Sequence, residues 1–384
     1  MGSNFRILPK HITLEKLILL LFVVFSSTHL QAQVFQKVTV TNDLNIDRSE
    51  VIAIQRSLLH TTVKKHAKKA FRIKREGTDS YLPTQWYDSD FDGVEDQVLL
   101  HVNIPAGSIL SYDIVLDSTR GASSSMVKTA VFKHNGQIYW ENESVVFRTP
   151  ERSKSKPSAF DFGIKPSAQA LESQLKKYKN KELPFQSLVS DVSHSLGLGA
   201  TAVLKDNVLE FAEKIEKLEI LAAGPIRTVF LLYYPTWGSQ KIGEIKRISI
   251  DKSALFISVD VFMTQPSKAL GYSIVAEGVL SQAKLTTDSR YYHLQTRKGE
   301  QELVQTVFFP YENPKDVQTF SADPALGTHT LFSYKPKDRF TFAVAYQLIP
   351  KTSAAAFKEW EQTVKNFELC RSNPLKVALK LPRE

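Results

Sequence analysis

The feature that most constrains the fold is a long succession of short runs in which apolar and polar residues alternate. From Val34 onward these runs are rich in β-branched and aromatic residues, and turn residues separate them. Period-two alternation indicates strands with one face in a core. The clearest runs are residues 34–40, 97–104, 109–116, 127–132, 226–234, 255–262, 272–280, 303–309 and 340–348. Many short strands at close spacing predict a mainly β chain, folded as a sandwich or barrel.

Two dipeptides predict hairpins between these strands. Asn135-Gly136 is the strongest short-range hairpin signal and joins residues 127–134 to residues 137–148. Asp206-Asn207 is expected to make a similar turn between residues 201–204 and 208–211.

Helices are expected in two places. One begins at Pro166-Ser167 and continues through Lys181, and the other runs from about Ser353 to Leu369. In the second, apolar residues recur at three- and four-residue steps, which is typical of a helix docked on the body of a protein.

The first 32 residues have the organisation of a secretory signal peptide. Three basic residues precede nine consecutive apolar residues, 17–25, and small or polar residues follow, up to about Ala32. The apolar run is less than half of the roughly 20 residues that a spanning helix needs, so no membrane anchor is expected. We expect export to the periplasm or the medium, and one β domain over residues 33–384.

The charge favours an anionic partner outside the cell. The 49 Lys and Arg against 40 Asp and Glu give a formal net charge of +9. Removing residues 1–32 takes away three basic residues and one acidic residue, which leaves +7. An exported protein meets no genomic DNA, so acidic or sulfated polysaccharides are favoured over nucleic acid. The single cysteine, Cys370, excludes an intrachain disulfide and a cysteine-based zinc site.

One acidic loop resembles a calcium-binding loop. Carboxylates stand at the first, third, fifth and ninth positions of residues 88–96, with glycine at the sixth. The expected ligands are Asp88, Asp90, Asp92, the Val94 carbonyl and Asp96. The alternative is an acidic turn whose carboxylates cap backbone amides. A bound Ca²⁺ is expected to be structural, and no organic cofactor is expected.

Three histidines stand where functional side chains concentrate. His134 borders the Asn135-Gly136 turn, His194 precedes Gly197, and His329 follows a glycine closely. Imidazole exchanges protons near neutral pH, as an enzyme that processes sugars without a metal requires. Each of the three also fits a packed or surface histidine.

The other motifs decide little. No serine-hydrolase elbow and no dinucleotide fingerprint is present. Glu141 and Glu143 lie two apart on a predicted strand and so share a face, which suits a carboxylate pair or a solvated edge. The basic run 64–75 holds seven Lys or Arg and fits either a surface that steers polyanions or an ordinary solvated strand.

Several segments together resemble a family of secreted bacterial proteins that degrade plant and algal polysaccharides, which includes an ulvan oligosaccharide dehydratase. These segments are residues 88–115, Trp140-Glu141-Asn142-Glu143 through Arg148, residues 195–200 and residues 223–228. Their order along the chain is the order of the family. The resemblance implies a large antiparallel sandwich of the galactose-mutarotase-like supersandwich type with a few helices.

The resemblance also implies a reaction, the removal of water across C4–C5 of a terminal uronic acid in acidic oligosaccharides. The C5 proton is acidic only when the neighbouring carboxylate is neutralised. Arg148 and Arg227 are the expected neutralisers, because a guanidinium grips a carboxylate with two hydrogen bonds. His134 and His194 are the expected base and acid, with Tyr139 in reserve.

Three further residues complete the expected substrate site, namely Trp140, Glu141 and His329. The Trp140 ring is expected to stack on a sugar face or, equally, to pack in the core. The alternatives to a dehydratase are a polysaccharide lyase, a mutarotase or epimerase, and a carbohydrate-binding protein without catalysis. The sequence indicates no oligomeric state.

Overall fold

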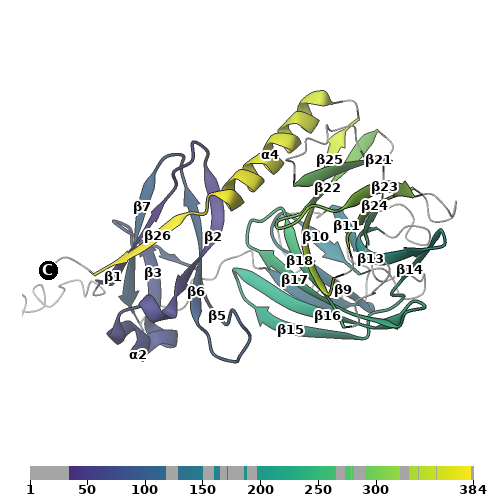
Figure 1. The fold of residues 1–384 in the computed structure, drawn as a ribbon. Coiled ribbons are helices and arrows are strands. Elements are labelled where there is room, and N and C mark those ends of the chain that lie inside the picture. Colours follow the sequence, from purple (N-terminus) through teal and green to yellow (C-terminus); the bar gives the residue numbers. More distant parts are fainter. Residues whose placement is uncertain are drawn as a thin grey trace, which may run out of the picture.

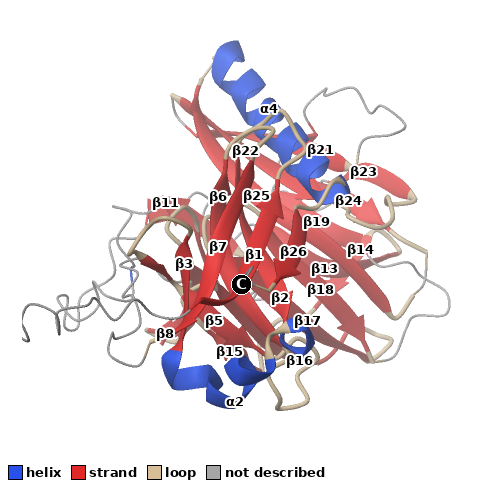
Figure 2. Ribbon diagram, turned by 90° about the vertical axis from the view of Figure 1, so that its left-hand side faces the viewer, coloured by secondary structure: helices blue, strands red, loops and turns tan. Residues whose placement is uncertain are grey.

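The structure is a computed structural model that describes most of the chain from Val34 to Leu381. The described residues are 34–117, 129–149, 160–164, 171, 186–187, 197–264, 273–277, 279–280, 290–298, 300–320, 328–335, 337–351 and 353–381. Strands dominate, and two α-helices are present in this part of the chain (Figure 2). The expected signal peptide and most of the expected helix at 166–181 lie outside the described residues.

The N-terminal strands form two sheets that face each other (Figure 1). The five-stranded sheet has the order β26 (Lys376–Lys380), β1 (Val34–Thr41), β7 (Ile109–Leu116), β3 (Phe71–Arg75) and β4 (Tyr81–Leu82). The three-stranded sheet has the order β2 (Arg48–Gln55), β6 (Gln97–Ile104) and β5 (Thr84–Tyr87). Apolar side chains such as Val40, Ile73 and Val98 fill the space between them and are fully buried. The last strand of the chain therefore returns to pair with the first described strand.

The remaining strands form three more sheets, two of five strands and one of eight. One has the order β12 (Gln186–Ser187), β11 (Asp161–Ile164), β10 (Val146–Arg148), β9 (Gln137–Glu141) and β8 (Ala130–His134). A second has the order β14 (Val208–Phe211), β13 (Leu198–Lys205), β19 (Ser273–Glu277), β24 (His329–Ser333) and β23 (Asp316–Phe320). The third has the order β15 (Lys217–Ala223), β16 (Arg227–Trp237), β17 (Ile242–Asp251), β18 (Ile257–Met263), β25 (Arg339–Pro350), β22 (Gln301–Phe308), β21 (Tyr291–Lys298) and β20 (Val279–Leu280). Their inner faces share one large apolar core.

The mainly β, antiparallel sandwich predicted from the sequence is confirmed. All strand pairings within these sheets are antiparallel, as in the β16–β17 and β22–β25 pairs. Both expected hairpin turns are present, because Asn135, Gly136, Asp206 and Asn207 all have positive φ angles. The single domain expected over residues 33–384 stays a prediction.

The helix expected near Ser353 is also present. It is α4 (Ala354–Ser372), and the Ser353 hydroxyl accepts a hydrogen bond from the Ala356 amide at its N-terminus. Trp360 and Val364 bury the apolar stripe of α4 against the eight-stranded sheet. The helix then leads across to β26 in the N-terminal sheets (Figure 1).

Of the two interpretations of the basic run 64–75, an ordinary solvated strand fits only its last part. Its first part is α2 (Thr61–Ala70), which follows the short 3₁₀ helix η1 (Arg56–Leu58), and only the last part is β3. The His60 ring caps α2 by accepting a hydrogen bond from the Thr62 amide at 3.2 Å. Val63, on the described part of the helix, is fully buried in the core between the two N-terminal sheets.

Candidate functional site

One row of side chains crosses four neighbouring strands of the sheet that contains β9. Phe132 on β8, Tyr139 on β9, Arg148 on β10 and Asp161 on β11 are direct register partners. Such partners place their Cβ atoms about 5 Å apart on the same face. The row therefore brings together two residues predicted for the site, Tyr139 and Arg148.

Hydrogen bonds fix the polar part of this row. Arg148 Nε donates to Asp161 Oδ2 at 2.6 Å, and the Asp161 carboxylate is fully buried. The Tyr139 hydroxyl donates to Gln137 Oε1 at 3.0 Å, and Arg148 Nη1 reaches the same oxygen at 3.4 Å. Burial lowers the pKa of Arg148, but the charge of Asp161 outweighs it and the pKa is raised. The guanidinium is therefore a permanent positive charge.

His134 lies beside the row, two residues after Phe132 on β8. The tight turn at Asn135-Gly136 makes His134 the register partner of Gln137. Its half-buried ring stands edge-on to the Tyr139 ring at 6.4 Å between centroids. His134 Nε2 is buried and has no hydrogen-bond partner among the described residues. The imidazole thus has a nitrogen that is not committed to the fold.

Apolar side chains cover Tyr139 on the side of the row that lies away from His134. Phe132 stacks on Tyr139 at 5.3 Å and 3°, and Ala130, Val146 and Leu171 pack beside them. The Tyr139 side chain is 3% exposed as a result. An ion pair or a hydrogen bond is stronger in such a dry environment than at the surface.

Trp140 faces the opposite side of the sheet, because neighbouring residues on a strand alternate in direction. It is completely buried in the large core, parallel to Phe147 at 5.9 Å and edge-on to Phe160 at 5.1 Å. The expectation that Trp140 stacks on a sugar is therefore corrected, and core packing is its role.

Arg227 lies away from this row, at the contact between the N-terminal sheets and β16. Its guanidinium forms two 2.6 Å bonds with the Asp251 carboxylate and lies over the Tyr87 ring at 5.4 Å. Burial lowers the pKa of Arg227, but the Asp251 carboxylate raises it by more, so the net pKa is raised and the pair is ionic. The expectation that Arg227 grips a substrate carboxylate is corrected, because Asp251 already takes both Nε and Nη2, the two donors of a bidentate grip, whereas Asp161 takes only Nε of Arg148.

Glu141 and His329 are buried. Glu141 shares the Tyr139 face of β9 but is fully buried, between Ala130 and Val146 in the register. His329 begins β24 and is also fully buried. Direct contact with a substrate is therefore not available to either side chain as the fold stands, which corrects both expectations.

His194 lies outside the described residues. The loop that follows it is described from Gly197, and Gly197 and Gly199 have φ angles of 57° and 79°. A Cβ on Gly199 would lie 3.1 Å from the Phe160 ring, so this position requires glycine for conformation and for space.

The acidic loop gathers three of its expected ligands. The carboxylates of Asp88, Asp90 and Asp92 have oxygens within 4.8 Å of one another. The Asp88 oxygens accept the Phe91 and Gly93 amides, both at 2.7 Å. A hydrogen bond from the Asp92 amide lowers the pKa of Asp90, but burial and the neighbouring carboxylates raise it more. Their mutual repulsion is what a bound cation relieves.

The fourth expected carboxylate is used differently. Asp96 accepts hydrogen bonds from the Ser89 amide at 2.8 Å and the Ser89 hydroxyl at 2.6 Å. It closes the base of the loop instead of joining the other three carboxylates. Val94 is exposed at the tip of the loop.

Sequence reasoning missed Gln137 and Asp161, which complete the polar row. Asp161 stands between Phe160 and Phe162, and an acid flanked by buried aromatic residues on a strand needs a partner. Gln137 lies two residues before Tyr139 and so shares its face. Both signals are visible in the sequence once the hairpin register is known.

A second buried polar group was also missed. Lys246 and Glu244 on β17 are fully buried with Nζ and Oε1 3.5 Å apart, and Lys246 Nζ donates to the Gly199 carbonyl at 2.8 Å. Trp237 Nε1 donates to Glu244 Oε2 at 3.0 Å. Burial raises the pKa of Glu244 and lowers that of Lys246. The group joins β17 to the start of β13.

Comparison with known proteins places this geometry in a wider context. Residues 40–175 and 189–377 match a family described as a domain of unknown function, DUF4861. A curated relative, the uncharacterized protein P7 of Formosa agariphila, is 28% identical over 274 residues. That match covers 62% of this chain and 67% of the relative.

Two solved structures from Enterococcus faecalis share the fold. One is described as a protein in the glycosyl hydrolase family 38, with a TM-score of 0.51 and 9% identity. The other is described as an alpha-mannosidase, with a TM-score of 0.50 and 10% identity. Each match covers 91% of this chain but less than half of the solved chain, 48% and 46% respectively.

Proposed function

The chain belongs to the DUF4861 family of domains of unknown function, and from this premise we propose that it is a carbohydrate-active enzyme that acts on acidic oligosaccharides. The β-rich fold shared with two glycoside hydrolase structures supports the sugar class. The positive charge of the chain supports an acidic ligand. One observation carries the proposal: His134, Tyr139 and Arg148, selected for this chemistry, lie together on one face of one sheet.

The proposed reaction is dehydration of the uronic acid at the non-reducing end of ulvan-type oligosaccharides. A base removes the C5 proton, and the electrons of that bond form the C4–C5 double bond. The C4–O bond breaks, and an acid protonates the departing hydroxyl, which leaves as water. The product is a 4,5-unsaturated uronate, and the enzyme is a carbon-oxygen lyase.

Arg148 is the residue we assign to the substrate carboxylate. Its permanent charge withdraws electron density from C5 and so acidifies the proton. The buried Asp161 holds the guanidinium in one orientation, and the Arg148 side chain remains 18% exposed. Asp161 is thus a positioning residue.

His134 is the residue we assign to proton transfer, with His194 as its counterpart and Tyr139 as the alternative. His134 Nε2 has no hydrogen-bond partner among the described residues, which supports this role, and the half-buried ring must turn outward for this buried nitrogen to reach a substrate. The Tyr139 proton is already directed to Gln137, so Tyr139 would need to exchange that bond to take part.

The test combines a spectroscopic assay with matched variants. Saturated uronate-terminated oligosaccharides should give a new absorbance near the ultraviolet edge, from the conjugated enol ether. His134→Ala should reduce the rate at least ~100-fold, the usual contribution of a general acid or base. Arg148→Lys should also reduce it, because lysine lacks the bidentate fork. His60→Ala, at the start of α2, serves as the control and should be fully active.

The other outcomes separate the alternatives. A polysaccharide lyase would release two sugar fragments instead of water. A mutarotase or epimerase would change configuration without a change in mass. A carbohydrate-binding protein would bind the oligosaccharide unchanged. Full activity of His134→Ala would remove His134 from the mechanism.

We further propose that residues 1–32 direct export and are then removed. None of the helices in the described part of the chain combines the length and the hydrophobicity that a membrane span requires. Comparing the N-terminus of the exported protein with that of the full chain tests this, and a retained residue 1 would refute it.

We also propose that Asp88, Asp90, Asp92 and the Val94 carbonyl hold a structural Ca²⁺. Phe91, within the loop, lies near Arg247 of β17 at 5.9 Å, so an ordered loop would steady that contact. Calcium should raise the melting temperature of the wild-type protein. The Asp90→Asn variant should show a smaller rise, and an equal rise in both proteins would rule out this site.

A further inference from the structure

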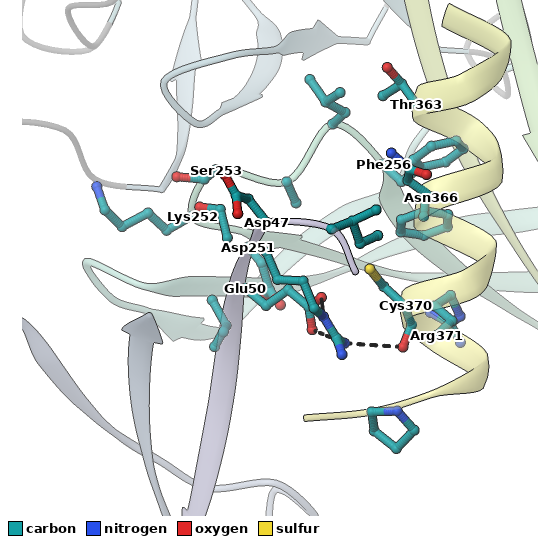
Figure 3. A pocket seen from close by; sticks show the side chains of 18 residues that line it. Asp47, Glu50, Asp251, Lys252, Ser253, Phe256, Thr363, Asn366, Cys370 and Arg371 are labelled. Atoms are coloured by element: carbon teal, nitrogen blue, oxygen red, sulfur yellow. Dashed lines mark hydrogen bonds and ion pairs between the residues drawn. The ribbon is translucent and has the colours of Figure 1, made fainter. Parts of the chain in front are cut away.

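A cavity of about 390 Å³ lies where three distant segments of the chain meet (Figure 3). Its walls come from residues 46–51 leading into β2, from residues 251–256 between β17 and β18, and from α4 with Pro374. The cavity is separate from the row at Tyr139, none of whose members lines it. Pockets of this size between packed units are the usual places for small ligands.

The charged groups in its walls are largely neutralised by the protein itself. Arg48 donates to both oxygens of Glu50, at 2.6 and 2.9 Å, and to the Cys370 and Asn373 carbonyls at the end of α4. Asp251 is held by the two bonds from Arg227. A charged ligand would therefore meet counter-ions that are already engaged.

Two other charged groups point elsewhere or lie at the rim. The Lys252 side chain extends away from α4 in Figure 3 and lies 3.6 Å from Glu143 Oε1. Asp47 and Arg371 are exposed and of opposite sign. The cavity as a whole presents no excess of either charge.

The uncharged lining has an apolar side and a polar side. Phe256 and Phe367 stack at 4.0 Å and 12° and form an aromatic wall. Ser253 and Thr363 donate their hydroxyl protons to Glu143 Oε1 and the Glu359 carbonyl, which leaves their oxygens as acceptors. Asn366 Oδ1 accepts from Gln362, which leaves its amide protons as donors.

We propose that this cavity binds a neutral pyranose, distinct from the acidic sugar of the proposed reaction. A pyranose has an apolar C–H face that suits the aromatic wall and a rim of hydroxyls that both donate and accept. The neutralised charges select against a uronate. Binding at this place would also join β2, the turn after β17 and α4, and so stabilise their arrangement.

Cys370 supplies the readout for a test, because it lines the cavity and is the single cysteine of the chain. Burial raises the pKa of its thiol to about 11, so iodoacetamide reacts with it slowly. Mass spectrometry then gives the fraction of protein molecules alkylated at each time. Galactose, glucose and mannose are added in increasing concentration, with glucuronate as the charged comparison. This assay needs no turnover, so it stands or falls independently of the proposed reaction.

At least one neutral hexose should slow alkylation about threefold or more, and the effect should saturate. Glucuronate should have little effect. Asn366→Ala should weaken protection by that hexose about tenfold, whereas Lys358→Ala, on the exposed face of α4, should leave it unchanged. Thr363→Leu, which fills the cavity, should abolish protection while α4 remains folded by circular dichroism.

Three results would overturn the proposal. They are the absence of protection by every hexose, equal protection by glucuronate, and unchanged protection in both the Asn366→Ala and Thr363→Leu variants.

Discussion

Acid should loosen the attachment of α4 through one buried histidine, His293 on β21. Trp360 Nε1 donates to Thr306 Oγ1 at 2.9 Å, and Thr306 Oγ1 lies 2.8 Å from His293 Nδ1. An indole only donates, so the Thr306 hydroxyl accepts from Trp360, and the imidazole tautomer decides which of Thr306 Oγ1 and His293 Nδ1 donates in the second bond. The ring is almost completely buried, and burial favours the neutral imidazole over the cation.

The magnitude follows from the histidine environment. Burial lowers the pKa of His293 from 6.5 to about 4, and its side chain is 1% exposed. The unfolded chain takes up a proton near pH 6.5, whereas the folded chain resists it until about pH 4. The stabilisation is thus complete above pH 6.5 and is lost as the pH falls from 6.5 toward 4. Between pH 7.5 and 4.5 the loss from this residue is about 2.5 kcal/mol.

The assay is urea unfolding followed by circular dichroism at pH 7.5 and at pH 4.5. Carboxylates also titrate in this range, so the informative quantity is the difference between wild type and His293→Gln. Glutamine can still accept the Thr306 proton but does not titrate. The variant should lose about 2.5 kcal/mol less on acidification than the wild type. Lys358→Gln, on the exposed face of α4, should lose as much on acidification as the wild type does.

Equal losses in wild type and His293→Gln would refute this reasoning. That result would mean that His293 is already charged in the folded protein, or that its ring is not held between Thr306 and the helix.

Three further substitutions test the packing around the site. Lys246→Met leaves the buried Glu244 without its cation and should lower the free energy of unfolding in urea by about 3–5 kcal/mol. Adding Glu244→Leu to this variant should restore most of that loss, and no recovery would contradict the pairing. Asn142→Ala removes the hydrogen bonds from Nδ2 to the Asp251 and Ala254 carbonyls, at 2.8 and 2.7 Å, and should lower the unfolding free energy by about 1–3 kcal/mol. An unchanged value would show that these carbonyls find other donors. Gly199→Ala should destabilise by more than about 1 kcal/mol in the same measurement, because φ is positive there; a neutral result would contradict the strained position.

The strands were predictable because their signal is local. Residues 97–104 and 109–116 match β6 and β7 to the residue, since alternation directly records which face is buried. Helix α2 was not predicted, because four lysines and a histidine among its ten residues mask the helical spacing of Val63, Ala67 and Ala70. Two of these three apolar residues are alanines, whose small side chains signal an apolar stripe only weakly.

The candidate site was predictable where a turn fixes the geometry. Asn135-Gly136 sets the β8–β9 register and therefore brings His134 close to Tyr139. The contact between Arg148 and Asp161 depends on which strand follows β10 in the sheet, and the sequence does not specify that order. Trp140 was assigned to a substrate for its residue type, but the alternation of β9 turns it toward the core.

The most direct test of the central claim is the mass of a saturated, uronate-terminated acidic oligosaccharide before and after incubation with the protein. The proposed dehydration predicts a product lighter by one water, formed by the wild type and not by His134→Ala. An oligosaccharide of unchanged mass, or one split into two fragments, would contradict it.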